Sequence, residues 1–452
     1  MIHSPQASPA VRIALTLMLA VLFAAAPPAH GAARAAPAGL SALERKLAAS
    51  VERHVPESIG LLQRAVDLNS GTLNLAGVRA VGALLQPEFE RLGFRTRWVD
   101  GAAWGRAGHL IAERGSRGHK VVLVGHLDTV FESDSPFQRF QQLDDSTATG
   151  PGVTDMKGGD VVLLLALRAL KDNGALDGLR VTVVLMGDEE RPGAPFELAR
   201  ADLRRAAEGA TAAIGFEDGD GDPRRVVVAR RGNSSWQLRV RGTAAHSSQV
   251  FSDGVGLGAI YEAARLLGEF RDSLGFEPYL TFNPGLIVGG TTIGHEPSSS
   301  RGTAFGKSNV VAESTLVTGD LRTLTLEQRG RAQATMQRIV AASSPRTSAS
   351  LTFEDGYPPL APTDGNLRLL AMAGQASRDL GLGPLEAVDP ARAGAADVSV
   401  IADRVPMIID AMGLKGSGGH TVSETARLNT LSWQAKRTAV LLHRLSRLPA
   451  GR

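Results

Sequence analysis

The sequence contains no cysteine, which excludes disulfide bonds, thiolate metal ligands and a lipid-attachment thiol. Aromatic residues are only 5% of the chain, and basic residues form no long run interleaved with aromatics, which argues against a nucleic-acid partner. A large charge of one sign is also lacking, because 49 Lys and Arg nearly balance 46 Asp and Glu, for a formal net charge of +3. Any metal site in this chain must therefore use histidine and carboxylate side chains.

The N-terminal segment has the pattern of an export signal. Arg12 precedes an apolar run over residues 13–26, and small residues follow up to about Gly31. This order is typical of a secretory signal, and the apolar run is shorter than the ~20 residues that a membrane span needs. We predict a signal peptide over residues 1–31, a periplasmic or secreted mature protein, and no stable membrane insertion after cleavage. An uncleaved anchor is the alternative.

Continuous apolar segments alternate with segments of helical spacing through the first half of the chain. The predicted strands are 109–115, 120–125 and 181–187, and the predicted helices are 40–68, 75–94 with an interruption at Pro87, and 160–174. With 43% hydrophobic residues, the chain can bury a large core in more than one domain. Apolar strands set between helices indicate an α/β sheet covered on both faces.

The pattern changes after about residue 230. Trp236, Leu238 and Val240 alternate with polar residues, as in a strand with one exposed face. We predict that a smaller α+β domain is inserted into the larger one. The predicted bounds are 40–230 for the first part of the larger domain, 231–343 for the inserted domain and 344–447 for the second part.

Residues that can ligate metals follow the apolar strands. His126 and Asp128 share one face where a strand ends, because side chains two positions apart on a strand point the same way. Asp155 lies between a glycine-rich turn and a predicted helix start. The other candidates follow later strands or lie in a late loop: Asp188, Glu189, Glu190, Glu217 and His420. Open α/β sheets place their ligand sites at such strand ends.

Each of these residues alone has an ordinary structural explanation. A single histidine after a strand is usually a surface or hydrogen-bonded residue, and acids such as Asp155 often cap helices. Their joint occurrence favours a metal site, because five loops each offer a nitrogen or oxygen ligand, which suits zinc, cobalt or manganese. Two histidines and three carboxylates exceed the needs of one catalytic zinc but fit two ions that share a carboxylate.

Three motifs in this order resemble one enzyme family. "GHLDTV", "GPGVTDMKGG" and "GDEE" are similar to the dinuclear zinc metallopeptidases related to bacterial glutamate carboxypeptidase, acetylornithine deacetylase, succinyl-diaminopimelate desuccinylase and the aminoacylases. The resemblance extends from about Leu43 to Leu445 and is nearest to bacterial glutamate carboxypeptidase. It implies a zinc-peptidase catalytic domain, with a mixed, mostly parallel sheet between helices, and an inserted ferredoxin-like lid and dimerisation domain.

The resemblance also implies roles for these residues. It implies two Zn²⁺ per subunit, with Co²⁺ or Mn²⁺ as possible substitutes, held by His126, Asp155, Glu190, Glu217 and His420. Asp155 would bridge the ions, with His126 and Glu217 on one and Glu190 and His420 on the other. Asp128 would orient the His126 imidazole, and Glu189 would be the general base for the attacking water. A cis peptide bond is expected between Asp155 and Met156.

The inserted domain carries further expected site residues. His246, in "VRGTAAHSSQ", would reach into the active site of a partner subunit, which requires at least a dimer or a closing lid, and a homodimer is expected. Arg322 and Asn309 would hold the substrate carboxylate and carbonyl, and Gly394 belongs to a further substrate-binding segment. That segment departs from the family pattern because Ala396 replaces a hydroxyl residue. The loop over residues 290–308 is longer and more polar than the family leads us to expect.

The sequence therefore predicts an exported two-zinc exopeptidase of carboxypeptidase type. Its expected substrates are small peptides or N-acyl amino acids. A deacylase or dipeptidase with the same metal core is the alternative. A non-catalytic scaffold is disfavoured, because all five ligands and Glu189 are present.

Overall fold

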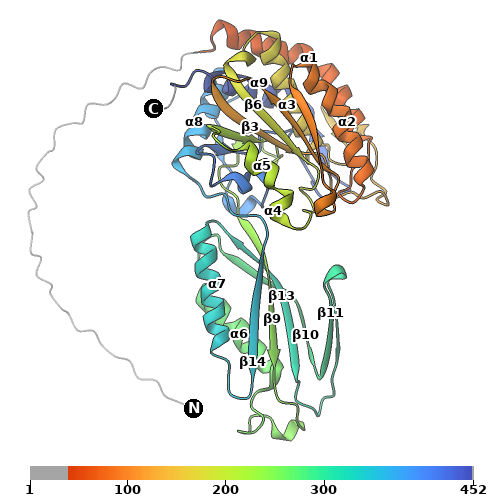
Figure 1. Ribbon diagram of the computed structural model, residues 1–452, viewed down its shortest axis with the longest axis vertical. Helices are drawn as coiled ribbons and strands as arrows, with labels where there is room; N and C mark the ends of the chain where they lie inside the picture. The colour runs from red at the N-terminus through yellow and green to blue at the C-terminus, as the bar shows by residue number, and fades with distance from the viewer. Residues whose placement is uncertain (1–38, 450–452) are drawn as a thin grey trace, which may run out of the picture. The chain divides into compact units, whose positions relative to one another are not determined.

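The computed structural model describes residues 39–449, so the predicted signal peptide lies outside the described residues. The α-helices are α1 (Ala42–Val66), α2 (Leu75–Arg91), α3 (Lys157–Asp172), α4 (Phe196–Ala199), α5 (Ala201–Ala206), α6 (Gly258–Leu274), α7 (Leu326–Ala341), α8 (Asp364–Asp379) and α9 (Asn429–Leu445) (Figure 1). Within residues 39–449, no helix combines the length and the apolar character that a membrane span requires.

The strands form two main sheets and smaller ones. Those of the larger domain are β1 (Arg95–Asp100), β2 (Gly108–Arg114), β3 (His119–His126), β4 (Gln141–Gln142), β5 (Thr147–Thr149), β6 (Leu179–Met186), β7 (Ala212–Gly215), β8 (Arg225–Val226), β15 (Glu386–Ala387), β16 (Ile408–Ile409), β17 (Gly416–Ser417) and β18 (Thr425–Arg427). Those of the inserted domain are β9 (Gly232–Arg241), β10 (Thr281–Gly290), β11 (Thr292–Glu296), β12 (Arg301–Phe305), β13 (Ser314–Thr323) and β14 (Ser348–Asp355).

The main sheet of the larger domain has six strands in the order β1-β2-β6-β3-β7-β16. The strands β6, β3, β7 and β16 are parallel to their neighbours in this series, whereas β1 and β2 add antiparallel pairs at one edge. The predicted mixed, mostly parallel sheet is confirmed. Parallel strands need crossover connections, and α3 provides the one from β3 to β6.

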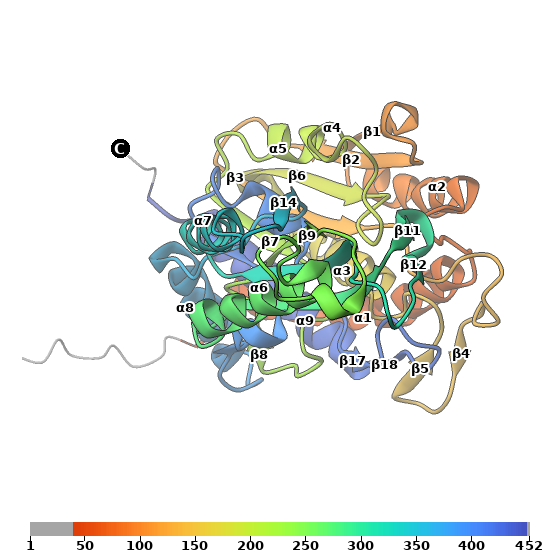
Figure 2. The ribbon, with the colours of Figure 1, turned by 90° about the horizontal axis from the view of Figure 1, so that it is seen from below.

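Both faces of this sheet are buried. Val121 and Leu123 of β3 belong to a core cluster with residues of α1, α3 and α9, while Val122 and Val124 belong to a second cluster with residues of α5. This alternation follows from the two-residue period of a strand. Figure 2 shows helices on either side of the sheet, as an α/β sheet requires.

The predicted interruption of α2 at Pro87 is wrong, because the helix continues to Arg91. A proline inside a helix costs about 3 kcal/mol through its missing N–H and its steric clash. Val78, Val81, Leu85 and Phe89 are nevertheless all buried along one side of α2. Each such side chain contributes roughly 1.5–3 kcal/mol on burial, so packing outweighs the loss at the proline.

The inserted domain has a four-stranded antiparallel sheet in the order β10-β13-β9-β14. Along the chain its elements run β9, α6, β10, β13, α7 and β14, which is the ferredoxin-like pattern, and the two helices cover one face (Figure 1). The side chains of Trp236, Leu238 and Val240 point into the core beneath these helices. The alternation read from the sequence in β9 is therefore confirmed.

Two details of the inserted domain differ from expectation. The sheet includes β14, which pairs with β9 beyond the predicted boundary at residue 343. The boundary was placed too early because β14 is an edge strand with only alternate residues half-buried, and its apolar signal is weak. The segment 290–308 is not simply a loop, since β11 and β12 form an antiparallel ribbon in it.

A small sheet joins distant parts of the chain. Its order is β17-β18-β5-β4, and in it Thr425 of β18 pairs with Thr149 of β5. This pairing brings the segment that carries His420 beside the loop that carries Asp155. The peptide bond between Asp155 and Met156 is cis, as expected.

The core of the inserted domain gives a test of its packing. Phe270 on α6 is fully buried and meets Trp236 edge-to-face, with ring centroids 6.2 Å apart. We expect Phe270→Ala to lower the free energy of unfolding by about 3–5 kcal/mol, as large-to-small core substitutions do. Urea unfolding would measure this change. Phe276→Ala is the matched control: its ring is 90% exposed, and a change above ~0.5 kcal/mol there would contradict the assignment.

Candidate metal centre

The parallel strands of the main sheet bring the predicted ligands to one edge. His126 is the last residue of β3, Glu189 and Glu190 follow β6, and Glu217 follows β7. Because β6, β3 and β7 are adjacent and parallel, their carboxyl ends lie side by side. The site therefore arises from strand order, which makes neighbours of His126, Glu190 and Glu217, residues between 27 and 91 positions apart in the sequence.

Asp155 lies between the two candidate histidines. Its Oδ1 is 3.2 Å from His126 Nε2, and its Oδ2 is 3.0 Å from His420 Nε2. A carboxylate in this position can bind one ion with each oxygen.

Each histidine also faces a second carboxylate. His126 Nε2 is 3.6 Å from Glu217 Oε1, and His420 Nε2 is 3.2 Å from Glu190 Oε2. One ligand atom each from His126, Asp155 and Glu190 lie within 4.8 Å of one another. The structure thus gathers all five predicted ligands into two groups that share Asp155.

The backbone of Asp128 sets the tautomer of His126. His126 Nδ1 is 3.0 Å from the Asp128 backbone carbonyl oxygen and 3.5 Å from the Asp128 carboxylate. A proton on Nδ1, donated to that carbonyl, leaves Nε2 free to act as a ligand. The predicted orienting contact is therefore made mainly by the main chain of Asp128.

The Asp128 carboxylate has a different set of partners. It accepts hydrogen bonds from the backbone N–H groups of Glu189 and Glu190, at 3.0 and 3.2 Å, and from the Thr72 hydroxyl at 2.7 Å. It is completely buried. Asp128 therefore fixes the backbone of the two acids after β6, a role that the sequence did not indicate.

The electrostatics of the cluster are dominated by carboxylates. Burial and the charge of Asp155 raise the pKa of Glu190 to about 7, and the same two causes raise the pKa of Glu217 well above its ordinary value. Hydrogen bonds with Asp155 and Glu190 raise the pKa of His420 to about 11. Although burial opposes it, hydrogen bonds from the two histidines hold the pKa of Asp155 well below its usual range.

The residues present fit divalent cations. Imidazole nitrogen and carboxylate oxygen form a donor set suited to zinc, cobalt or manganese. Within residues 39–449, neither Lys nor Arg forms an ion pair with Asp155, Glu190 or Glu217, and buried Glu190 Oε1 has no hydrogen-bond partner. A cation at this position would therefore balance the excess negative charge of the carboxylates and would also give Glu190 Oε1 a partner.

A buried network supports Glu189 from behind. Arg200 contacts Asp188 and Asp397, each at 2.8 Å, and donates to the Tyr357 hydroxyl at 2.5 Å. The Tyr357 hydroxyl donates to the backbone carbonyl oxygen of Glu189 at 3.0 Å. Sequence reasoning missed Arg200 and Tyr357, because a single arginine and a single tyrosine carry no pattern that marks them as buried.

His246 and Asn309 lie together at the outer end of the inserted domain. β9 leaves the larger domain at Gly232, and His246 follows its far end. The N–H of Ser247 donates to the Asn309 backbone carbonyl at 2.9 Å, and the His246 side chain is exposed. Within one chain, these two residues therefore lie away from the metal ligands.

Arg322 and Gly394 lie closer to the larger domain. Arg322 pairs with Asn233 near the start of β9, roughly 25 Å along the strand from its far end at ~3.4 Å per residue. Its Nε donates to Asp320 at 2.7 Å. The Gly394 carbonyl accepts from Arg230, and its α-carbon faces open space. The structure thus separates Arg322 from His246 and Asn309, although the sequence had grouped them.

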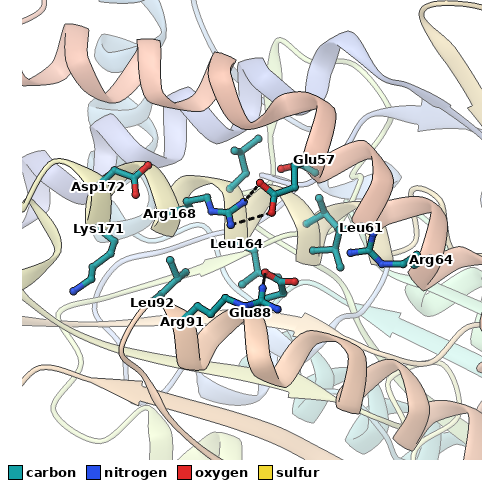
Figure 3. A pocket seen from close by; sticks show the side chains of 13 residues that line it. Glu57, Leu61, Arg64, Glu88, Arg91, Leu92, Leu164, Arg168, Lys171 and Asp172 are labelled. Atoms are coloured by element: carbon teal, nitrogen blue, oxygen red, sulfur yellow. Dashed lines mark hydrogen bonds and ion pairs between the residues drawn. The ribbon is translucent and has the colours of Figure 1, made fainter.

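Figure 3 shows a separate cavity, of about 290 Å³, between α1, α2 and α3. Leu61 lines it together with several charged side chains. Arg168 pairs with Glu57 at 2.7 Å, and Arg91 pairs with Glu88. None of the five candidate ligands lines this cavity, so it is distinct from the cluster.

An α/β sheet with a cluster of histidine and carboxylate side chains at its strand ends, carrying an inserted ferredoxin-like domain, is an arrangement suited to metal-assisted hydrolysis. The chain belongs to peptidase family M20/M25/M40, whose pattern matches residues 122–444. It is similar to carboxypeptidase G2 of Pseudomonas sp. strain RS-16, with 24% identity over 368 residues that cover 81% of this chain and 83% of that protein. The predicted family resemblance is confirmed.

Solved structures share the fold. Aminopeptidase PepT from Bacillus cereus has a TM-score of 0.69 and 19% identity, with 87% of this chain and 99% of that chain covered. A dinuclear metal binding peptidase of the M20 family from Bacillus subtilis has a TM-score of 0.60 and 14% identity, with 87% and 98% covered. At these identities the likeness concerns the fold, and it confirms the predicted fold class.

The raised pKa values predict how metal binding depends on pH. A group whose pKa is higher in the folded state contributes stability below its unfolded pKa and loses it as pH rises through the folded value. For Glu190 this window runs from the ordinary pKa of 4.5 to the raised pKa of about 7, and for His420 it runs from a pKa of 6.5 to one of about 11. The metal-free protein should therefore become less stable as pH rises through these windows.

Divalent ions must displace these same protons, so binding is favoured at higher pH. We expect Zn²⁺ to raise the melting temperature more at about pH 8 than at about pH 5.5. Thermal unfolding with added Zn²⁺ and with a chelator, at both pH values, measures the difference. An equal increase in melting temperature at the two pH values would contradict the hypothesis that the ligands stay protonated until an ion binds.

Proposed function

We propose that this protein is an exported two-zinc exopeptidase of carboxypeptidase type that hydrolyses small peptides or N-acyl amino acids. The observation that carries the proposal is the position of Asp155, with one carboxylate oxygen beside His126 and the other beside His420. Similarity to carboxypeptidase G2 over most of both chains supports the carboxypeptidase type.

The five ligands would hold the ions in two groups. His126 and Glu217 would hold one ion, Glu190 and His420 would hold the other, and Asp155 would bind both. Two ions suit the three buried carboxylates better than one, because a single ion leaves charge uncompensated. When bound, the ions supply Lewis acidity, which polarises the scissile carbonyl and lowers the pKa of a nearby water.

Glu189 is the proposed general base. Burial raises the pKa of its carboxyl well above the ordinary value, and the negative charges of Asp397 and Glu190 add to this effect. A base with a raised pKa accepts a proton more readily near neutral pH. Glu189 takes the proton of the attacking water and delivers it to the leaving amine, while Asp128 and Tyr357 hold its backbone from both sides.

A homodimer is the proposed working form. His246 lies beyond the far end of β9, so a second copy must supply it if it is to stabilise the oxyanion. Ile260 and Tyr261 on α6 are exposed, and Tyr261 lies against exposed Phe251 with ring centroids 5.5 Å apart. β10 lies at the edge of its sheet. These apolar side chains, together with an edge strand, form a surface suited to a second copy.

Substrate binding and export complete the proposal. Arg322 suits the carboxylate at the end of a peptide, because its planar guanidinium matches a carboxylate. Asn309 would hold the substrate carbonyl, and Gly394 leaves room beside the Arg230 contact. Residues 1–31 have the composition of a signal peptide, which supports a periplasmic or secreted location.

The central test is hydrolysis of a panel of dipeptides and N-acyl amino acids, glutamate-terminated ones included, with Zn²⁺ present. We expect Glu189→Gln to lower kcat by about 10²–10⁴-fold, the usual contribution of a general base. Calorimetric titration should find its Zn²⁺ stoichiometry unchanged. The rates at which the different substrates are hydrolysed, and the products released, distinguish carboxypeptidase, deacylase and dipeptidase activity.

Glu197→Gln is the matched control, since Glu197 is an exposed acid eight positions further along the chain. It should keep wild-type activity. Wild-type protein that binds Zn²⁺ but hydrolyses nothing on the panel would refute the substrate class. Wild-type protein that binds no Zn²⁺ would refute the metal centre itself.

The dimer has its own test. Tyr261→Glu would place a charge in the proposed apolar interface, where desolvation is unfavourable. We expect light scattering to find a dimer for the wild type and a monomer for the variant, and we expect the variant to lose activity. Leu143→Glu, at an exposed position of the larger domain, should leave both unchanged. A monomeric wild type with full activity would rule out a shared active site.

A further inference from the structure

Glu424 contributes a buried carboxylate that contacts the Asp155 loop. Its Oε2 accepts the N–H of Gly152 at 3.0 Å. Its Oε1 accepts the N–H groups of Thr154 and Asp155, at 2.8 and 3.1 Å, and the Thr154 hydroxyl at 3.0 Å. The side chain is completely shielded from solvent. In the part of the chain that the structure describes, every hydrogen bond of this carboxylate goes to residues 152–155.

In the described part of the chain, no lysine or arginine pairs directly with this carboxylate. Among residues 39–449, Glu424 forms no ion pair with a lysine or arginine within 4.0 Å, and backbone N–H groups take that place. Burying an ionised carboxylate is unfavourable unless donors surround it, and convergent backbone N–H groups form such a cradle. Because three N–H groups and one hydroxyl donate to this one carboxylate, we assign it a specific structural role.

The loop conformation is what makes these donors converge. Gly152 has a φ of +74°, and a Cβ there would lie 2.6 Å from a methyl carbon of Thr129. Its backbone therefore turns in a way that favours glycine, and its N–H points toward Glu424. Because the N–H of Asp155 joins the same cradle, Glu424 fixes the main chain at the residue that faces both histidines.

Glu424 also anchors the segment that carries His420. The N–H of Glu424 donates to the Thr421 carbonyl at 3.0 Å, and the N–H of Thr421 donates to Gly418 at 3.0 Å. His420 itself has a φ of +62°, which is unfavourable for a residue with a side chain and persists only where neighbours hold it. Its side chain is 59% exposed, so packing supplies little of that support. The hydrogen bonds from Glu424 to Thr421 and from Thr421 to Gly418 supply that support instead.

We propose that Glu424 is a positioning residue for the metal centre. Its carboxylate links the loop of Asp155 to the segment of His420, and so presets the spacing of two ligands that come from distant parts of the sequence. An ion held by Glu190 and His420 would depend on both linked segments, whereas an ion held by His126 and Glu217 would depend on only one of them, the loop of Asp155. This inference rests on the proposed function, because it presumes two bound ions.

The test is calorimetric titration of Zn²⁺ alone into metal-free full-length protein, wild type and Glu424→Gln. The amide of glutamine presents N–H donors where the carboxylate accepts them, so part of the cradle is lost while the volume is kept. We expect two ions per chain in the wild type. In the variant, one ion should bind with nearly unchanged affinity and the other roughly 10–100-fold more weakly, as when a residue supporting a ligand is lost.

Glu262→Gln is the matched control. Glu262 is also a fully buried glutamate, but it lies in the inserted domain and bonds to Arg265 and Ser344. It should bind both ions as the wild type does, even if its melting temperature falls. A Glu424→Gln protein that binds both ions with wild-type affinity would overturn the positioning role, whatever its stability. A wild type that binds no Zn²⁺ would instead overturn the proposed function and, with it, this inference.

A milder variant covers the case in which Glu424→Gln does not fold. Thr154→Val removes only the hydroxyl that donates to Glu424 and keeps the side-chain shape. We expect the same selective weakening of one ion, by a smaller factor, and a changed visible absorption spectrum when Co²⁺ replaces Zn²⁺. Unchanged affinities and an unchanged Co²⁺ spectrum in this variant would overturn the proposal.

Discussion

The structure of the centre depends on one constraint: among residues 39–449, three largely buried carboxylates lie together without a lysine or arginine partner. Asp155, Glu190 and Glu217 face the same two imidazoles. Like charges at about 4 Å repel by on the order of 4 kcal/mol at the effective dielectric of a protein near its surface. The chain must hold these groups in place against that repulsion, and protons or divalent cations must balance the charge.

The supporting structure works mainly through the backbone. Asp128 holds the N–H groups of Glu189 and Glu190, Tyr357 holds the carbonyl of Glu189, and Glu424 holds the loop of Asp155. Hydrogen bonds between side chains and main-chain groups fix position without adding a cation that would compete with a metal. Tyr357 lies just after β14, so the inserted domain returns to the larger one at a residue that contacts Glu189, the proposed general base.

The sequence could predict the sheet from local signals, and polar residues at strand ends together with the family resemblance supplied the five candidate ligands. Apolar runs that end in polar loops marked β3 and β6, and the parallel order then brought His126 and Glu190 together. The supporting residues could not be predicted in this way. Arg200 and Glu424 act through tertiary contacts with segments far along the chain, and nothing in the residues around them distinguishes them from exposed charges. The edge strand β14 was assigned to the wrong domain for a related reason, since half of its surface is solvated.

The pairing of β18 with β5 has a consequence for how the protein folds. The hydroxyl of Thr149 donates to the backbone carbonyl of Glu424, 275 positions further along the chain. Contacts of such high sequence separation form late, because loop closure must come first. Until then the chain offers His126, Asp155 and Glu217 but lacks His420 beside them. In the proposed two-ion centre, a cation that arrives early would meet only one of the two ligand groups, and the second group would be complete only after these distant segments have paired.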